Sequence, residues 1–248
     1  MSTQSINRVT IPTSNGEVLK GMVLGKKVES GKQPVILVIH GWTSSMSRYP
    51  QRLAPALEKG YICVFFDMRG HGETGGDLSQ YSRKDHFDDC LAAYDFMTKL
   101  PMIDLDNIFV FGSSYGGYMA SLLSEKRPVH NLILKAPAQY PDEGWEVPKL
   151  SQEKDAVGGY RLKHHSPEDN MALKAISKYQ GKLLFLECEN DEQVPKQVIN
   201  DYREFIPIKY DYELLEGSDH TCQLPGMNEK FIERMGKWLS RVYEEKYS

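Results

Sequence analysis

Short, almost continuously apolar segments alternate with longer segments of helical spacing along most of this 248-residue chain. Unbroken apolar runs are typical of strands buried on both faces, and parallel neighbours need crossover connections. Strands are expected at residues 34–39, 61–66, 107–111, 131–135 and 182–187, and helices between them at 49–59, 83–99 and 115–126. The alternation predicts an α/β fold with a mostly parallel central sheet and helices on both faces.

The two ends of the chain extend this pattern. Residues 6–11 and 18–24 flank the turn-like Ser14-Asn15-Gly16 and predict an antiparallel hairpin at the edge of the sheet. Residues 209–215 supply a last strand, and residues 228–243 a closing helix.

Residues 138–180 interrupt the alternation. Prolines and glycines are frequent in the first half of this segment, and a helix-like pattern follows at 167–179. We expect residues 1–248 to form a single domain, with 138–180 inserted as a small cap over the carboxyl edge of the sheet. Five residues of this cap either line an apolar pocket or only pack within the cap: Trp145, Val147, Leu150, Tyr160 and Met171.

The charge balance argues against polyanionic partners. The chain has 30 basic and 34 acidic residues, so it shows no electrostatic footprint for nucleic acid or for an anionic membrane surface. It contains no apolar run long enough to span a bilayer, no signal-peptide core and no Cys-x-x-Cys pair. We therefore expect a reduced, cytoplasmic protein without nucleic acid, membrane span, metal or cofactor.

Residues 112–116 read Gly-Ser-Ser-Tyr-Gly, a Gly-x-Ser-x-Gly motif centred on Ser114. The motif follows a predicted strand and opens a predicted helix, and a sharp turn of this kind holds a serine hydroxyl clear of the backbone. Three fixed residues occur by chance in about one chain in ten of this length, so the motif alone permits an ordinary turn serine. Its setting favours Ser114 as a nucleophile over Ser113, which lacks small residues two places away.

A serine hydroxyl needs a histidine to accept its proton and a carboxylate to orient that histidine. Asp191 lies in the loop after the predicted strand 182–187, and His220 follows the last predicted strand. The chain order Ser114, Asp191, His220 is the order of a nucleophile-elbow serine hydrolase.

Each partner has an alternative interpretation. Asp191 could cap a helix that begins near Val194 or Pro195, and His220 could be an exposed loop histidine. Three other carboxylates could replace Asp191: Glu189, Glu192 and Asp219.

Two backbone amides are predicted to bind the anion that forms on the attacked carbonyl. One belongs to Tyr115, at the start of the helix after the nucleophile. The other belongs to Trp42, where the chain leaves the predicted strand 34–39, although a purely structural turn is the alternative there. The glycine-containing loop 67–72 is predicted to be structural. His164-His165 matches no familiar metal-ligand spacing, which favours a solvated loop.

With these motifs in place, the chain resembles the α/β-hydrolase superfamily over nearly its full length. The resemblance rests on His40-Gly41, on residues 67–72 and 112–117, on Asp191 ahead of Val194-Pro195, and on His220. It implies the α/β-hydrolase fold and a catalytic triad of Ser114, Asp191 and His220.

The elbow also looks like that of prolyl-oligopeptidase-type serine peptidases, which implies peptide substrates, although this chain does not hold their large N-terminal propeller. Dienelactone hydrolases are similar in size but use a cysteine where this chain has Ser114. Small acyl esterases, including feruloyl esterases and monoacylglycerol lipases, resemble it better.

The expected function is hydrolysis of a small-molecule carboxylic ester, or a thioester, through an acyl-enzyme on Ser114. Two alternatives remain: a prolyl-oligopeptidase-like peptidase, and a binding protein that keeps a hydrolase fold without turnover.

Overall fold

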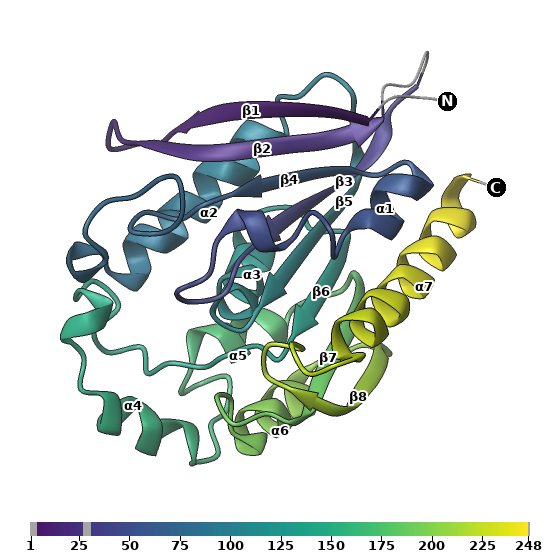
Figure 1. Cartoon of the computed structure of the whole chain (residues 1–248). Helices are drawn as coiled ribbons and strands as arrows, with labels where there is room; N and C mark the ends of the chain where they lie inside the picture. The colour runs from purple at the N-terminus through teal and green to yellow at the C-terminus, as the bar shows by residue number, and fades with distance from the viewer. Residues whose placement is uncertain (1–3, 27–30, 248) are drawn as a thin grey trace.

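The computed structural model describes residues 4–26 and 31–247, and these residues form one eight-stranded sheet flanked by helices (Figure 1). The strands are β1 (Gln4–Pro12), β2 (Val18–Lys26), β3 (Gln33–Ile39), β4 (Ile62–Phe66), β5 (Ile103–Ser113), β6 (Asn131–Lys135), β7 (Lys182–Asn190) and β8 (Asp211–Asp219). They lie in the order β1-β2-β4-β3-β5-β6-β7-β8.

The six strands β3 to β8 are mutually parallel, whereas β1 and β2 form an antiparallel hairpin, with β2 antiparallel to β4. This arrangement confirms the predicted fold class and the hairpin at the sheet edge. Since parallel strands end at the same edge, the loops after β3, β5, β6, β7 and β8 meet there.

Seven α-helices lie in the described ranges: α1 (Ala54–Lys59), α2 (Arg83–Met97), α3 (Tyr115–Lys126), α4 (Lys154–Arg161), α5 (Met171–Ile176), α6 (Lys196–Phe205) and α7 (Met227–Tyr247). Two begin later than predicted. The helix expected at 49–59 begins only at Ala54, because Pro55 lacks an N–H and fits only the first turn. The helix expected at 167–179 begins at Met171, after Asn170 caps it through the N–H groups of Ala172 and Leu173.

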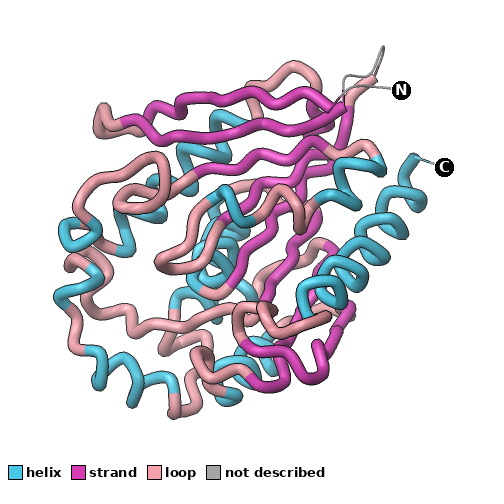
Figure 2. Tube along the Cα trace, in the orientation of Figure 1, coloured by secondary structure: helices cyan, strands magenta, loops and turns pink. Residues whose placement is uncertain are grey.

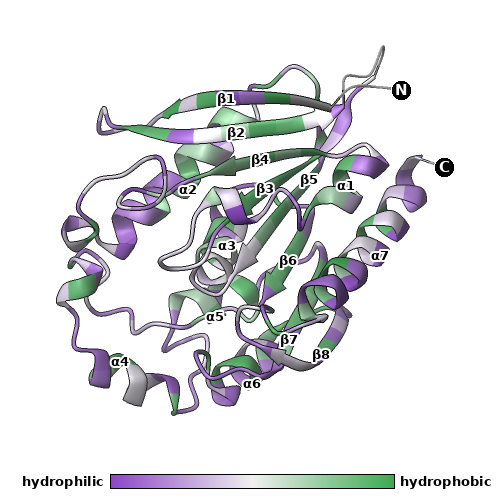
Figure 3. Cartoon of the chain, viewed as in Figure 1, coloured by the Kyte–Doolittle hydropathy of each residue, from purple (hydrophilic) through white to green (hydrophobic). Residues whose placement is uncertain are grey.

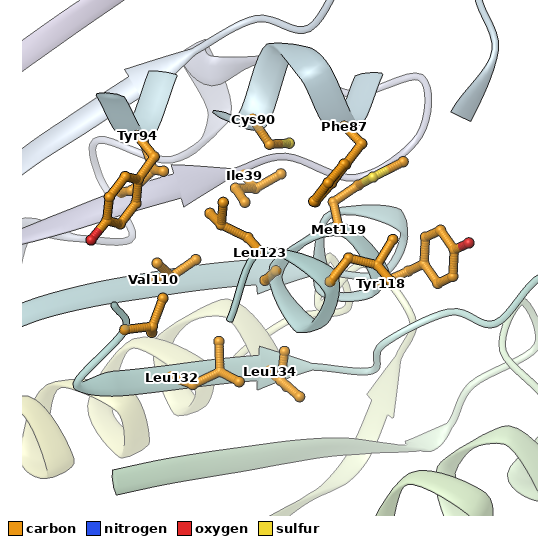
Figure 4. Close-up of a cluster of buried hydrophobic side chains, with 14 of the residues drawn as sticks. Ile39, Phe87, Cys90, Tyr94, Val110, Tyr118, Met119, Leu123, Leu132 and Leu134 are labelled. Carbon is orange, nitrogen blue, oxygen red and sulfur yellow. The ribbon is translucent and has the colours of Figure 1, made fainter. Parts of the chain in front are cut away.

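Helices α1 and α7 pack on one face of the sheet, and α2, α3, α5 and α6 pack on the other. Because side chains alternate along a strand, Val110 of β5 faces α3 while its neighbours Phe109 and Phe111 face α7. Figure 4 shows part of the buried apolar cluster between the sheet and helices α2 and α3, to which Leu132 and Leu134 of β6 belong. Apolar residues accordingly dominate the central strands in Figure 3.

The predicted cap is rich in loops (Figure 2) and divides into two parts. Its α5 buries an apolar face against α3 and so belongs to the helical layer rather than to a cover over the sheet edge. Residues 140–161, which include α4, contribute side chains to a cleft beside Ser114. The cap therefore approaches the carboxyl edge of the sheet through its first half.

The described helices include none with the length and apolar character that a membrane crossing requires. The four cysteines are buried free thiols.

Candidate active site

Ser114 forms a strained elbow between β5 and α3. Its backbone has φ 55° and ψ −116°, a conformation that costs a serine about 1–3 kcal/mol. Its N–H donates to the Lys135 carbonyl, and its own carbonyl accepts the N–H groups of Gly117, Tyr118 and Ala138. Bonds from two neighbouring segments therefore hold the elbow in this conformation.

Glycine at position 116 allows the elbow to approach β3 closely. A Cβ at Gly116 would clash with the Ile39 carbonyl oxygen and lie 2.7 Å from that of His40. A Cβ at Gly41 would lie 3.6 Å from Cβ of Ser114, so the loop after β3 runs directly beside the serine. Only a glycine at 116 lets the helix start this near to β3.

Asp191 and His220 are directly bonded. Nδ1 of His220 donates to Oδ2 of Asp191 at 2.6 Å, and both side chains are more than nine-tenths buried. Oδ1 of Asp191 accepts the N–H groups of Gln193 and Val194. Asp191 thus caps a turn before α6 and holds His220 at the same time, so the two interpretations of this residue are compatible.

Electrostatics keep the Asp191 carboxylate ionised. Burial by itself would raise the pKa of Asp191, but the hydrogen bond and charge of His220 and the two backbone N–H groups lower it below its usual value. The proton of the pair therefore stays on Nδ1 of His220, which leaves Nε2 as the atom that can accept a proton.

The alternative carboxylates have other partners or face solvent. Asp219 accepts the N–H groups of its own loop, including those of Thr221 and Gln223, and Glu189 accepts that of Gly217. Glu192 is exposed. Of these carboxylates and Asp191, only Asp191 bonds to His220.

Ser114 and His220 line the same cleft, but Oγ of Ser114 makes no hydrogen bond to any described residue. The structure thus bonds His220 to Asp191 and places Ser114 in a cleft that His220 also lines. In free enzymes such serine–histidine contacts are often long and shorten when substrate binds.

The amides of Trp42 and Tyr115 are both available as donors. Neither N–H is hydrogen-bonded within the described part of the chain. Their side chains contact each other edge to face, with ring centroids 5.3 Å apart. Two unpaired N–H groups beside the predicted nucleophile are the arrangement that an oxyanion hole requires.

Two buried neutral histidines form hydrogen bonds with the segments around Trp42 and Tyr115. His40 accepts the Met68 N–H at Nε2, so its Nδ1–H donates to the Gly41 carbonyl. His86 donates through Nε2 to the Arg69 carbonyl and accepts the Tyr115 hydroxyl at Nδ1. Burial lowers the pKa of both His40 and His86 to about 3, so both stay uncharged.

The loop at residues 67–72 has the structural role predicted for it. Asp67 accepts the N–H of Met46 at 2.6 Å and that of Glu73 at 2.8 Å, and thereby ties this loop to the one after β3. Gly72 has φ 45°, and any side chain there would clash with the Asp67 carboxylate.

Three cationic residues near Ser114 were missed from sequence. Lys135 is 1% exposed and its Nζ donates to the His220 carbonyl at 2.6 Å. A lysine that ends an apolar strand at the carboxyl edge of the sheet is a signal that could have revealed it. Lys149 and Arg161 belong to the irregular cap, where no periodicity marks them.

Two clefts meet at Ser114. We call the larger, of about 400 Å³, the cap cleft; it is lined by Trp42, Ser114, Tyr140, Lys149, Leu150, Gln152, Lys154, Val157, Gly158, Arg161, Gln193 and Val194. The second, of about 240 Å³, we call the histidine cleft, because His220 lines it together with residues such as Arg48, Arg52 and Lys135. Trp42, Ser114 and Gln193 line both.

For these cap residues, the structure favours the packing interpretation over the apolar pocket. Among the five cap residues expected to line it, only Leu150 borders the cap cleft. Trp145 packs on Phe87, and the ring of Tyr160 stacks on His165 at 3.7 Å. These two rings contact other parts of the protein, and both charged and apolar side chains line the cap cleft.

His164 and His165 have partners outside the site. His164 contacts the buried carboxylate of Asp201 at 3.0 Å, while His165 stacks on Tyr160. No group of three or more potential metal ligands occurs among residues 4–26 and 31–247.

A family model described as "Serine aminopeptidase, S33" matches residues 31–203. The chain belongs to this serine aminopeptidase S33 family. The match includes Trp42, Ser114, Tyr115 and Asp191 and ends before His220. Membership makes this S33 chain a serine hydrolase with the α/β-hydrolase fold, as the resemblance implied.

Among curated proteins, the S33 chain is similar to the probable dipeptidyl-aminopeptidase B of Talaromyces marneffei, at 24% identity over 240 residues. That alignment covers 86% of this chain and 25% of the relative, so this S33 chain spans about a quarter of the relative's length.

Two solved structures show the same fold. An acylaminoacyl peptidase from Pyrococcus horikoshii superimposes with a TM-score of 0.73 at 20% identity, covering 100% of this S33 chain and 43% of the peptidase chain. Est1E from Butyrivibrio proteoclasticus, solved with ferulic acid bound, superimposes with a TM-score of 0.70 at 18% identity, covering 96% of this chain and 98% of that one.

Proposed function

We propose that this protein hydrolyses carboxylic esters through an acyl-enzyme formed on Ser114. The observation that carries the proposal is the convergence, at one edge of the sheet, of a strained serine, two unpaired N–H groups and a bonded Asp191–His220 pair. Each group supplies one part of acyl transfer, namely a nucleophile, an oxyanion site and a general base.

In the proposed reaction, Nε2 of His220 accepts the proton of Ser114 as Oγ attacks the substrate carbonyl. The resulting oxyanion accepts hydrogen bonds from the N–H groups of Trp42 and Tyr115. His220 then donates the proton to the departing alkoxide, and the acyl-enzyme remains. Water repeats the sequence with His220 as base and releases the carboxylic acid, while Asp191 keeps Nδ1 protonated throughout.

Charge in the clefts favours an ester over an aminopeptidase substrate. An aminopeptidase holds a positive α-amino group close to the scissile carbonyl, and such a group needs a carboxylate partner. None of the residues lining the two clefts is an aspartate or a glutamate, and several are lysine or arginine. A free ammonium group would therefore be repelled from this site.

The family and the T. marneffei relative favour a second candidate, a peptidase, because both carry peptidase names. An ester is the less demanding substrate, since an alkoxide leaves more easily than an amine anion. Acylated peptides without a free amino group are the form of this alternative that the charge of the clefts permits.

Ser114→Ala tests the proposed function. We expect it to abolish hydrolysis of short p-nitrophenyl esters and labelling by a fluorophosphonate probe, with an unchanged circular dichroism spectrum. Ser113→Ala is the matched control and should keep both. Retained activity in Ser114→Ala would refute the nucleophile, and a folded wild-type protein that neither labels nor turns over would favour the binding-protein alternative. Anilides with blocked amino groups, assayed beside the esters, separate the peptidase from the esterase.

A further inference from the structure

The position of His220 distinguishes the two clefts chemically. In acyl transfer the general acid protonates the leaving group, so the leaving group must lie on the histidine side of Ser114. His220 lines the histidine cleft and not the cap cleft. If Ser114 is the nucleophile, the cap cleft therefore holds the acyl part of the substrate.

Lys149 carries an unpaired ammonium group in the cap cleft. Its Nζ lies 3.6 Å from the centroid of the Trp42 ring, 5.1 Å from that of Tyr140 and 5.4 Å from that of Tyr115. It forms no ion pair or hydrogen bond with any residue that the structure describes. Aromatic faces hold the ammonium in place but leave its N–H groups free for a ligand.

Burial makes this ammonium costly without a counter-charge. Desolvation, together with Arg161 and Arg83, lowers the pKa of Lys149 to about 7. Among the described residues, the ionisable groups around it are Arg83, Arg161, His71 and the phenols of Tyr115 and Tyr140, and none of these is a carboxylate.

Arg161 is a second positively charged side chain of the cap cleft without a carboxylate partner among the described residues. Its guanidinium carbon lies 4.4 Å from the centroid of the Tyr140 ring, and Nε donates to the Gln139 carbonyl at 2.7 Å. Its two terminal nitrogens bond to no described residue. A guanidinium fixed by one bond and one ring presents a planar fork that fits a carboxylate.

The positive lining does not reflect the overall charge of the protein. The chain has a formal net charge of −4, yet the cap cleft contains Lys149, Lys154 and Arg161 and is lined by no acidic residue. A cleft lined by one sign of charge attracts ligands of the opposite sign, so this cleft favours an anion.

We propose that the cap cleft binds a carboxylate on the acyl part of the substrate, through Lys149 and Arg161. The substrate class is then the monoester of a dicarboxylic acid. This proposal rests on the proposed function, because it takes Ser114 as the nucleophile.

The test compares two esters of equal acyl length, mono-4-nitrophenyl adipate and 4-nitrophenyl hexanoate. The wild-type protein should hydrolyse the adipate ester with the higher kcat/KM. Lys149→Met and Arg161→Met should each lower the adipate-to-hexanoate ratio of kcat/KM by about 10- to 100-fold, the effect of one charge-assisted hydrogen bond. Lys149→Arg keeps the charge and should keep most of the preference.

Lys163→Met is the matched control, since Lys163 is an exposed lysine of the same segment outside the cleft. It should leave the ratio unchanged. A wild-type protein that prefers the hexanoate ester, or a ratio that Lys149→Met does not change, overturns the carboxylate subsite while the ester hydrolase survives.

A second readout does not depend on turnover. Adipate should bind to the Ser114→Ala protein in a calorimetric titration, and Lys149→Met in that background should weaken the binding about tenfold or more. Absence of adipate binding overturns the subsite. Absence of both turnover and fluorophosphonate labelling in the wild-type protein overturns the proposed function instead, so the two failures are distinguishable.

Discussion

Asp191→Asn should inactivate the enzyme by changing which nitrogen of His220 carries the proton. Three donors converge on the two carboxylate oxygens: the N–H groups of Gln193 and Val194 on Oδ1, and Nδ1–H of His220 on Oδ2. Asparagine has one oxygen and one NH₂ group in these places. Whichever way the amide turns, its NH₂ group faces a donor.

The structure decides which way the amide turns. With its NH₂ group at the Oδ1 position, two backbone N–H groups would lose their acceptor, at a cost of about 1–3 kcal/mol each. With its NH₂ group toward His220, the imidazole can move its proton to Nε2, which costs little. The second arrangement is therefore favoured by about 2–6 kcal/mol, and in it Nε2 can no longer accept the Ser114 proton.

Loss of the correct tautomer, together with loss of the negative charge beside the imidazolium, should lower kcat by about 10⁴-fold, or about 5.5 kcal/mol. The assay is the steady-state hydrolysis of a short p-nitrophenyl ester near neutral pH, with fluorophosphonate labelling rates as a second measure. KM should change much less than kcat, because Asp191 does not line either cleft.

Glu192→Gln is the control, since it neutralises an exposed carboxylate one residue away. It should keep wild-type kcat. The reasoning is refuted if Asp191→Asn retains kcat within tenfold of the wild type, or if substitution of Glu192 causes the larger loss.

Two further predictions concern packing and pH. Gly116→Ala should destabilise the fold by about 3 kcal/mol or more, because its Cβ would clash with the Ile39 carbonyl. The control Gly159→Ala, in an open stretch of α4, should be neutral or stabilising by up to about 1 kcal/mol. Equal denaturation midpoints for the two variants would contradict this prediction. The adipate-to-hexanoate ratio should fall as pH rises through about 7, because Lys149 is charged below its lowered pKa and neutral above it. Both esters would be hydrolysed by the same proposed triad, so the ratio cancels the titration of the base. A flat profile from pH 6 to 9 would argue against Lys149.

Much of the fold could be predicted because its signals are local. An apolar run between turn residues indicates a buried strand wherever it occurs, and the elbow motif requires only that a strand precede it and a helix follow it. Element ends were less predictable, as at Ala54 and Met171, where a proline and a capping asparagine set the first turn. The chain order of Ser114, Asp191 and His220 could likewise be predicted from the sequence, because the loops that follow parallel strands lie at the same edge of the sheet.

By itself, the sequence determined that this chain builds a mostly parallel α/β sheet with a serine elbow at its carboxyl edge. The tertiary structure alone decided which carboxylate bonds to His220 and which side chains line the clefts. Cap residues such as Trp145 turned inward to bury apolar surface, whereas Lys149 and Arg161 turned to the cleft. Such choices depend on contacts between distant segments, and no periodicity in the cap records them.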